Sequence, residues 1–197
     1  MIRIAALLLA LVLLPQSAFA AESAYTKLNL EKDCVFHSEY EQGASAYCTG
    51  FKGYPVHFSE GDLRQMVRFG HFYSLLGFWE SFSQFNRIND TIEWRLKDGK
   101  PYAAILRWFI ENADDNGNFS KASEGQVLVV SRVADSYNEQ PNGCVIGYVD
   151  AKENSNANEL ARQISDELAD DFDCIRDNPK FYGNRGKLSG DPSKSVE

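Results

Sequence analysis

Histidine is the side chain best suited to proton transfer near neutral pH, and the chain has three copies of it, His37, His57 and His71. One candidate acid/base or metal-binding set is formed by His57, Glu60, Asp62 and His71. The spacing from His57 to Glu60 is H-x-x-E, which is not a zinc signature, and a histidine in a strand or loop is usually a partly exposed polar residue. The set therefore supports one hypothesis, a small hydrolase using the region of His57, His71 and Asp62, without a motif behind it.

Established catalytic motifs are missing from the sequence. It contains no G-x-S-x-G, H-E-x-x-H, S-x-x-K, G-x-x-x-x-G-K or G-x-G-x-x-G pattern, which removes the recognisable nucleophile, zinc-protease and phosphate-loop sites. We therefore predict no catalytic residue, no cofactor and no metal ligand, and we favour a non-catalytic protein over an enzyme.

Residues 112–124 are rich in the oxygen-bearing side chains that calcium prefers. Gly117 stands where a calcium loop needs its sharp turn, but Ser123 occupies the place of the final bidentate acid and Glu124 comes one position late. An Asx-rich hairpin loop is the simpler interpretation, and weak calcium binding stays open. The side chains that imitate calcium ligands are Asn112, Asp114, Asn116, Asn118 and Ser120.

Three residues are candidates for ligand recognition, namely Trp79, Arg95 and Arg107. Trp79 lies in an aromatic stretch, residues 78–85, that has no clear partner strand. A role in anchoring a loop to the core is the more ordinary interpretation, and Trp79 is the best single candidate for an exposed recognition residue. Arg95 and Arg107 would share the outer face of a hairpin with Glu93. There they would either receive an anionic ligand or form a solvated ladder of ion pairs.

The hairpin that positions these arginines is predicted over residues 91–110. Apolar residues alternate with charged ones on both sides of an Asp-Gly turn signal. With a three-residue loop, residues 97–99, Trp94 pairs with Tyr102 and the two apolar rows merge on one face. A two-residue loop would pair Trp94 with Ala103 and divide the rows. We therefore predict the three-residue loop and a buried Trp94.

The remaining elements are predicted from shorter patterns. From Asn156, small and apolar residues recur at helical spacing up to Cys174 and predict one amphipathic helix, which we expect to cover the sheet face that carries Trp94. The fold class is therefore α+β, mainly antiparallel β-sheet with one C-terminal amphipathic helix packed on a sheet face. Further strands are expected at 34–39, 44–49, 54–58, 126–133 and 144–150. Residues 62–73 fit either a strand or a helix, and we favour a strand.

The cysteine count is even, which fits an oxidising compartment in which every thiol is paired. The cysteines are Cys34, Cys48, Cys144 and Cys174. None is spaced as C-x-x-C, which argues against a thioredoxin-like site and a zinc ribbon. Three pairings exist, and we favour Cys34 with Cys48 and Cys144 with Cys174, because each of these pairs spans one supersecondary unit.

Residues 1–20 are typical of a secretory signal peptide. Arg3 precedes an apolar run that is too short to span a bilayer, and an A-x-A cleavage site ends at Ala20. The mature protein is expected to begin near Ala21 and to be released without a membrane anchor, into the periplasm or the medium. Its first residues, 21–33, are polar and expected to be loosely ordered.

Beyond the signal, residues 21–182 are predicted to form a single α+β domain, followed by a disordered tail at 183–197. The full chain has a formal net charge of −8, and loss of Arg3 makes it −9. This acidic balance, with no basic patch interleaved with aromatic residues, argues against a nucleic-acid partner.

A resemblance is carried by the stretches 48–56, 60–64, 93–95, 105–108, 148–151 and 158–162, together with Cys144. In these stretches the chain resembles a group of uncharacterised exported proteins of alphaproteobacteria. The resemblance implies a Gram-negative envelope setting and brings no assigned activity with it. We therefore expect an exported binding module whose partner is an envelope protein or a wall glycan.

Overall fold

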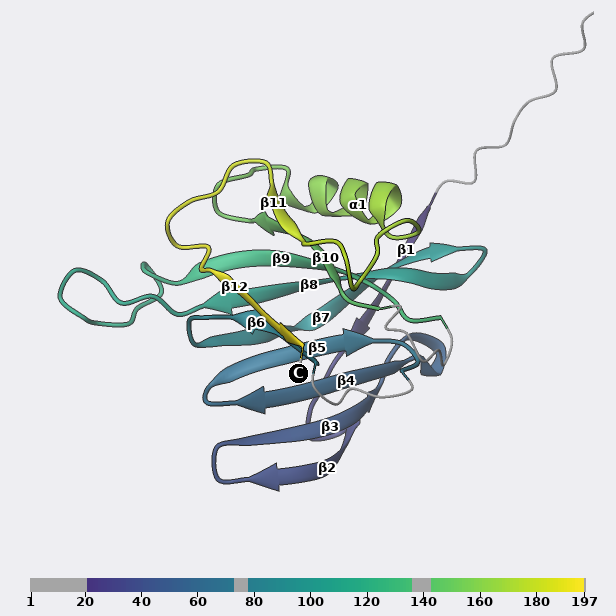
Figure 1. The fold of residues 1–197 in the computed structure, drawn as a ribbon, viewed down its shortest axis with the longest axis horizontal. Helices are drawn as coiled ribbons and strands as arrows, with labels where there is room; N and C mark the ends of the chain where they lie inside the picture. Colours follow the sequence, from purple (N-terminus) through teal and green to yellow (C-terminus); the bar gives the residue numbers. More distant parts are fainter. Residues whose placement is uncertain (1–20, 73–77, 136–142, 197) are drawn as a thin grey trace, which may run out of the picture.

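The computed structural model describes residues 21–72, 78–135 and 143–196, and Figure 1 shows their course. The predicted fold class is confirmed, because antiparallel strands dominate and one helix near the C-terminus packs on a sheet. No helix in the described ranges is long and apolar enough to cross a membrane. The elements are β1 (Glu22–Lys27), β2 (Cys34–Tyr40), β3 (Gly43–Thr49), the 3-10 helix η1 (Phe51–Gly53), β4 (Pro55–Gly61), β5 (Arg64–Phe69), β6 (Phe78–Phe82), β7 (Asn86–Lys97), β8 (Lys100–Ile110), β9 (Gly125–Arg132), β10 (Val145–Asp150), α1 (Ala157–Leu168), β11 (Lys180–Tyr182) and β12 (Pro192–Val196).

The strands form two main sheets that bury a common core. One sheet has the order β1-β7-β8-β9-β10-β11 and the other β2-β3-β4-β5. Their facing side chains, among them Trp94, Leu106, Val56 and Phe69, form one apolar cluster. A third, two-stranded sheet of β6 and β12 adds Phe82, whose ring packs on Trp108. Helix α1 lies on the other side of the six-stranded sheet, so that the molecule has three layers (Figure 1).

The register of the β7–β8 hairpin differs from the prediction. Lys97 pairs with Lys100, so the loop has two residues, and Asp98 and Gly99 both have positive φ as a tight hairpin turn requires. Trp94 pairs with Ala104 instead of Tyr102, because an irregularity in the ladder beyond the turn shifts the register. The two apolar rows still merge on one buried face, except that the side chain of Tyr102 packs on the helix side.

The position of the helix also differs from the prediction. The stripe of α1 packs on Ile105, Val130 and Ile146, which lie on the face opposite Trp94. The Trp94 face is covered by the four-stranded sheet, and the Phe69 ring meets the Trp94 ring at a centroid distance of 5.4 Å. The sequence pattern of residues 34–69 predicts strands but not that they form a second sheet with an apolar face of its own. The helix ends at Leu168, well before Cys174.

Both ends of the described chain are more regular than their composition suggests. Residues 21–33 were expected to be loosely ordered, but β1 pairs along its whole length with β7 and Leu28 is buried. The prediction of a disordered tail at 183–197 is also wrong for residues 183–196, because β12 pairs with β6 and Ser189 is buried. In both cases the backbone of a neighbouring strand supplies the order that the polar side chains do not indicate.

Both predicted disulfides are present, Cys34–Cys48 and Cys144–Cys174. The first joins directly paired positions of β2 and β3, and the second ties the start of β10 to the segment after α1. Segment 62–73 is not one strand, since Asp62 and Leu63 form a positive-φ turn before β5 begins.

Candidate functional site

The structure does not assemble the proposed catalytic set. His57 is buried in β4, and its Nε2 lies 2.8 Å from the carbonyl oxygen of Gly70. Burial lowers the pKa of His57 below its usual value, against a smaller opposing effect of the Gly70 contact. Asp62 lies five residues away, in the turn after β4, which is about 16 Å along an extended strand. Its carboxylate is paired with Arg64 at 2.6 Å, so Asp62 and His57 cannot act on one substrate atom.

The histidines instead take part in ring contacts on the outer face of the four-stranded sheet. His37 stacks on Tyr47 at a centroid distance of 4.3 Å, and Tyr47 meets His57 edge-on at 5.2 Å. His71 packs against Tyr54. The described part of the chain holds no group of three His, Cys, Asp or Glu side chains arranged for a metal ion.

Trp79 does not lie in an irregular loop. It belongs to β6, pairs with Ser195 of β12 and is half-buried. This partner strand was not predicted, because β12 lies in the segment expected to be a tail. Trp79 therefore lies on a strand and not in a loop, and its use in recognition stays a prediction.

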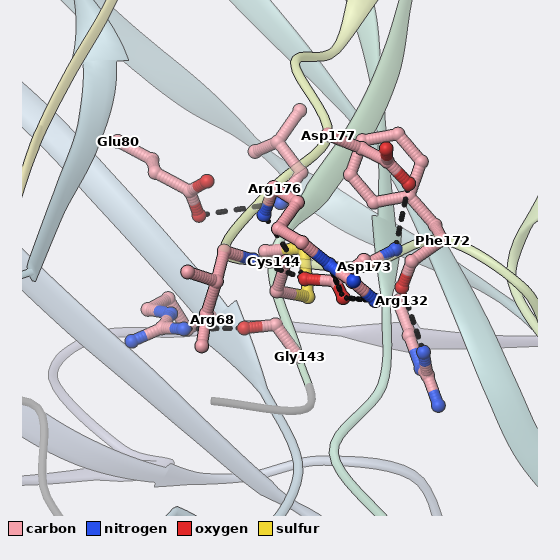
Figure 2. The surroundings of a disulfide bond; sticks show 12 residues. Arg68, Glu80, Arg132, Gly143, Cys144, Phe172, Asp173, Arg176 and Asp177 are labelled. Atoms are coloured by element: carbon pink, nitrogen blue, oxygen red, sulfur yellow. Dashed lines mark hydrogen bonds and ion pairs between the residues drawn. A yellow bond between two sulfur atoms is a disulfide. The ribbon is translucent and has the colours of Figure 1, made fainter. Parts of the chain in front are cut away.

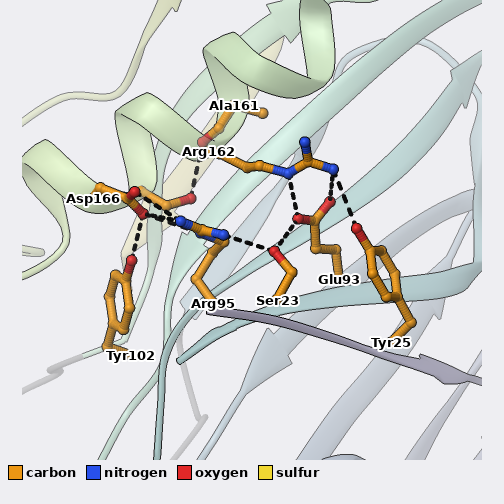
Figure 3. A network of polar contacts seen from close by, with 9 residues as sticks. Ser23, Tyr25, Glu93, Arg95, Tyr102, Ala161, Arg162 and Asp166 are labelled. Carbon is orange, nitrogen blue, oxygen red and sulfur yellow. Dashed lines mark hydrogen bonds and ion pairs between the residues drawn. The ribbon is translucent and has the colours of Figure 1, made fainter. Parts of the chain in front are cut away.

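Arg95 is engaged beneath helix α1, as Figure 3 shows. Its guanidinium donates to both carboxylate oxygens of Asp166, the closest at 2.7 Å, and to the hydroxyl of Ser23. The Tyr102 hydroxyl donates to the same Asp166 carboxylate, and burial raises the pKa of Tyr102. Nearby, Arg162 of α1 pairs with Glu93. This network fixes the helix to the sheet and leaves Arg95 no open side for an anion.

Arg107 is separate from that network. It lies on β8 four positions beyond Ala103, the partner of Arg95, which is about 13 Å along the strand. Its guanidinium donates to the side-chain oxygen of Gln126 at 3.0 Å. The structure therefore does not bring Arg95 and Arg107 together into one anion site.

A buried charge cluster surrounds the Cys144–Cys174 disulfide, shown in Figure 2. Arg68 donates to the Gly143 carbonyl oxygen, and the carboxylate of Glu80 accepts from the Val145 N–H at 3.2 Å. Lys194 of β12 donates to the Cys174 carbonyl oxygen and lies 3.8 Å from Glu80. Burial raises the pKa of Glu80 and lowers that of Arg68 to about 10. These contacts anchor both chain segments of the disulfide.

A polar hollow of about 460 Å³ lies between the β7–β8 turn and the end of α1. Three of its charged side chains are engaged within the protein. Lys97 pairs with Asp170, and Arg132 donates to the carbonyl oxygen of Phe172. The hollow offers no activated nucleophile, so we treat it as a solvated recess.

The Asp114 loop has the geometry of an Asx-rich hairpin. One Asp114 carboxylate oxygen accepts the backbone N–H groups of Asn116 at 2.9 Å and Asn118 at 2.8 Å, and Ala113 bridges to Phe119. Gly117 takes the positive φ that the turn requires. An oxygen used in this way is turned inward onto the loop's own backbone.

The feature that the sequence interpretation missed is the edge position of strand β2, together with the groove beside it. β2 is the outermost strand of its sheet, and its large apolar side chains are exposed on both faces, Val35 at 72% and Phe36 at 38%. A groove of about 500 Å³ opens on the Phe36 side. The signal was the adjacent pair Val35-Phe36, which becomes informative only once β2 is known to be an edge. The groove is lined by Leu30, Phe36, Glu41, Gln42, Gly43, Ala44, Phe58, Glu60, Asp62 and Leu63.

Comparison with protein-family models, with curated proteins and with solved structures found no match for this chain. The function proposed below is therefore argued from the residues of this chain and their arrangement.

Proposed function

We propose that the chain is a non-catalytic exported protein of the Gram-negative envelope that binds another protein along strand β2. Two disulfides fit an oxidising compartment outside the cytoplasm. The signal-like residues 1–20 and the resemblance to exported alphaproteobacterial proteins support the same setting. The separation of Asp62 from the histidines weighs against the hydrolase alternative.

The open edge of β2 is the observation that carries this proposal. Within the described ranges, β2 pairs with β3 on one side and with no strand on the other. Such an edge presents unpaired backbone N–H and C=O groups to an added strand. Protected edges usually carry lysine or proline, and β2 has neither, although one irregularity between Phe36 and Ser38 limits its regular length.

The exposed side chains give the edge an affinity beyond backbone pairing. An added strand would cover Val35 on the outer face and Phe36 on the inner face, and would remove their apolar surface from water. A wall glycan is the second candidate, because Tyr47, half-exposed and stacked on His37, would offer a sugar a flat ring surface. The first experiment separates these two partners.

Site-specific photo-cross-linking in the source cells tests the proposal. A benzophenone amino acid replaces Val35 in one strain and Phe119 in a control strain, since Phe119 is equally apolar and 59% exposed but lies in the distant Asp114 loop. We expect a discrete protein adduct from position 35 and none from position 119. Adducts at neither position, or at both alike, would contradict a binding edge at β2, and a glycan-sized adduct from position 35 would favour the wall partner.

A charge placed on the edge provides a second test. Val35→Lys should abolish adducts from a benzophenone at Ser38, because a lysine on an edge strand opposes strand addition. Ile175→Lys, which alters an exposed apolar residue elsewhere, should leave them unchanged. Retention of the adduct in the Val35 variant would show that the partner does not use the strand edge.

A further inference from the structure

We infer that the segment bound along β2 is an extended peptide in which an apolar residue and a lysine or arginine occupy neighbouring positions on one face. This inference rests on the proposed function and states the chemistry of the partner. It follows from the order of the side-chain rows that cross the groove face of the four-stranded sheet.

The first row is apolar. Phe36 of β2 pairs with Ala46 of β3, and Ala46 pairs with Phe58 of β4, so the three side chains share one face. Phe58 is buried and forms the floor of the groove, whereas Phe36 stands at its open side. A strand added outside β2 extends this row by one position. An apolar side chain at that position would cover the exposed surface of Phe36.

The next row toward the β2–β3 turn is acidic. Glu39 pairs with Ala44, and Ala44 pairs with Glu60, whose carboxylate accepts a hydrogen bond from Gln65. Glu41 and Asp62 stand at the same end of the groove. The added strand extends this row as well, and there its side chain lies beside Glu39, which is exposed. A cationic side chain is the complement of that position.

The same charges argue against a second copy of this chain as the occupant. Two β2 strands joined in parallel would place the exposed Glu39 side chains of both copies side by side, and any pairing would bring together two negatively charged molecules, each with a formal net charge of −9 after loss of Arg3. Like charges placed opposite each other across strands are destabilising. A separate, basic and apolar segment satisfies both rows.

Fluorescence anisotropy with three labelled peptides tests this inference on the oxidised protein beginning at Ala21. In the first peptide every second residue is either lysine or an apolar residue, valine or phenylalanine, and these two kinds alternate. Serine occupies the positions between them, so that the lysine and apolar side chains share one face of the extended peptide. The second carries glutamate in place of lysine, and the third is the first with alternate backbone nitrogens methylated. We expect the lysine peptide to bind at least about tenfold tighter than the glutamate peptide, less tightly at high salt, and not at all when methylated.

Glu39→Lys is the matched variant, and Glu167→Lys makes the same charge change on the exposed side of α1. We expect Glu39→Lys to remove the preference for the lysine peptide and Glu167→Lys to keep it. Equal binding of the lysine and glutamate peptides, or an unchanged preference in Glu39→Lys, would overturn the inference while adducts at position 35 still uphold the proposed function. Loss of those adducts would instead overturn the proposed function. Concentration-dependent dimerisation that Val35→Lys abolishes would assign the edge to a second copy and overturn the inference.

Discussion

Arg162 of helix α1 donates hydrogen bonds to both carboxylate oxygens of Glu93 on β7, at 2.6 and 3.3 Å, across the sheet face opposite Trp94. Ser23 of β1 donates to the same carboxylate at 2.6 Å. Glu93 thereby joins the helix, the central hairpin and the first strand. The sequence pattern placed Glu93 on an open face, and the structure places it under the helix.

Removal of the Glu93 carboxylate should therefore be costly. We expect Glu93→Ala to lower the free energy of unfolding by about 2 kcal/mol, because it leaves the partly buried Arg162 without its carboxylate partner and with only the Tyr25 hydroxyl. Lys27→Ala, which breaks the exposed pair with Asp90, should cost about 0.5 kcal/mol or less. Urea denaturation of both variants measures the difference. Equal losses would mean that the Glu93 pair is as weak as a surface pair.

The core between the two sheets should depend strongly on Trp94. Its side chain is fully buried, and its indole N–H donates to the Thr26 hydroxyl at 2.8 Å. Trp94→Ala should cost about 3 to 5 kcal/mol through lost burial and a cavity, whereas truncation of the half-exposed Tyr47 should cost about 1 kcal/mol at most. Denaturant midpoints and slopes decide this. A small loss at Trp94 would show that the sheets do not pack as described.

The two disulfides should contribute comparably to stability. Peptide mapping under non-reducing conditions should recover Cys34 with Cys48 and Cys144 with Cys174, and no free thiol. Replacing both cysteines of a pair with alanine should cost about 3 kcal/mol for the shorter loop and about 4 kcal/mol for the longer one in the chain-entropy model. A peptide linking Cys34 to Cys144 would refute the pairing.

Burial of His57 should make the protein less stable in mild acid. The folded pKa lies below the unfolded value of 6.5, so the unfolded chain binds protons first as the pH falls. The stabilisation is complete above about pH 6.5 and is lost as the pH falls toward the folded pKa. Arg68, His71 and His37 act in the same direction, since each disfavours a positive charge on the ring.

Denaturant melts at pH 7.5 and pH 5 measure this loss. His57→Gln should show a smaller loss of stability between the two pH values than the parent protein. His37→Gln, which removes only the smallest of these effects on His57, should lose nearly as much as the parent. The comparison of variants is needed because the raised pKa of buried Glu80 acts with the opposite sign, removing stability as the pH rises above 4.5. An identical pH dependence in His57→Gln and the parent would refute the assignment.

Calcium should bind weakly if at all to residues 112–124. The Asp114 oxygen already accepts two backbone N–H groups, and the twelfth-position acid is missing. Calorimetric titration should give a dissociation constant no tighter than about 10⁻⁴ M. Micromolar binding that Asp114→Asn abolishes would contradict this prediction.

Local patterns predicted local structure well. The alternation around Trp94 predicted a hairpin and a buried tryptophan, and the short spans between cysteines predicted both disulfides. The predicted length of the β7–β8 loop was wrong. The two apolar rows share one face because of a register shift between Arg95 and Leu96, and not because of the three-residue turn that we predicted. Such irregularities leave little trace in a pattern of alternating residues.

Long-range relationships were the harder part. The pairing of β12 with β6 and of β1 with β7 depends on partner strands distant in the sequence, and the polar side chains of the end segments hide it. The same limit applies to the groove, since Val35 and Phe36 look like ordinary strand residues until β2 is seen at the edge of its sheet. The helix was predicted on the wrong face of the hairpin, because the Trp94 face is the more apolar one. The opposite face carries Glu93 and Arg95, which form ion pairs with the helix that the sequence pattern does not indicate.

The end strands also set the order in which the chain can fold. Asp191 bonds to Gln84, 107 positions away, just before β12, and Ser23 of β1 bonds to Arg95, 72 positions away. Closing such loops costs entropy before any contact repays it, so a topology of this kind forms slowly, on a scale of milliseconds to seconds. Strand β12 also carries Lys194, which donates a hydrogen bond to the Cys174 carbonyl oxygen. The native packing around that disulfide is therefore complete only once β12 has paired with β6.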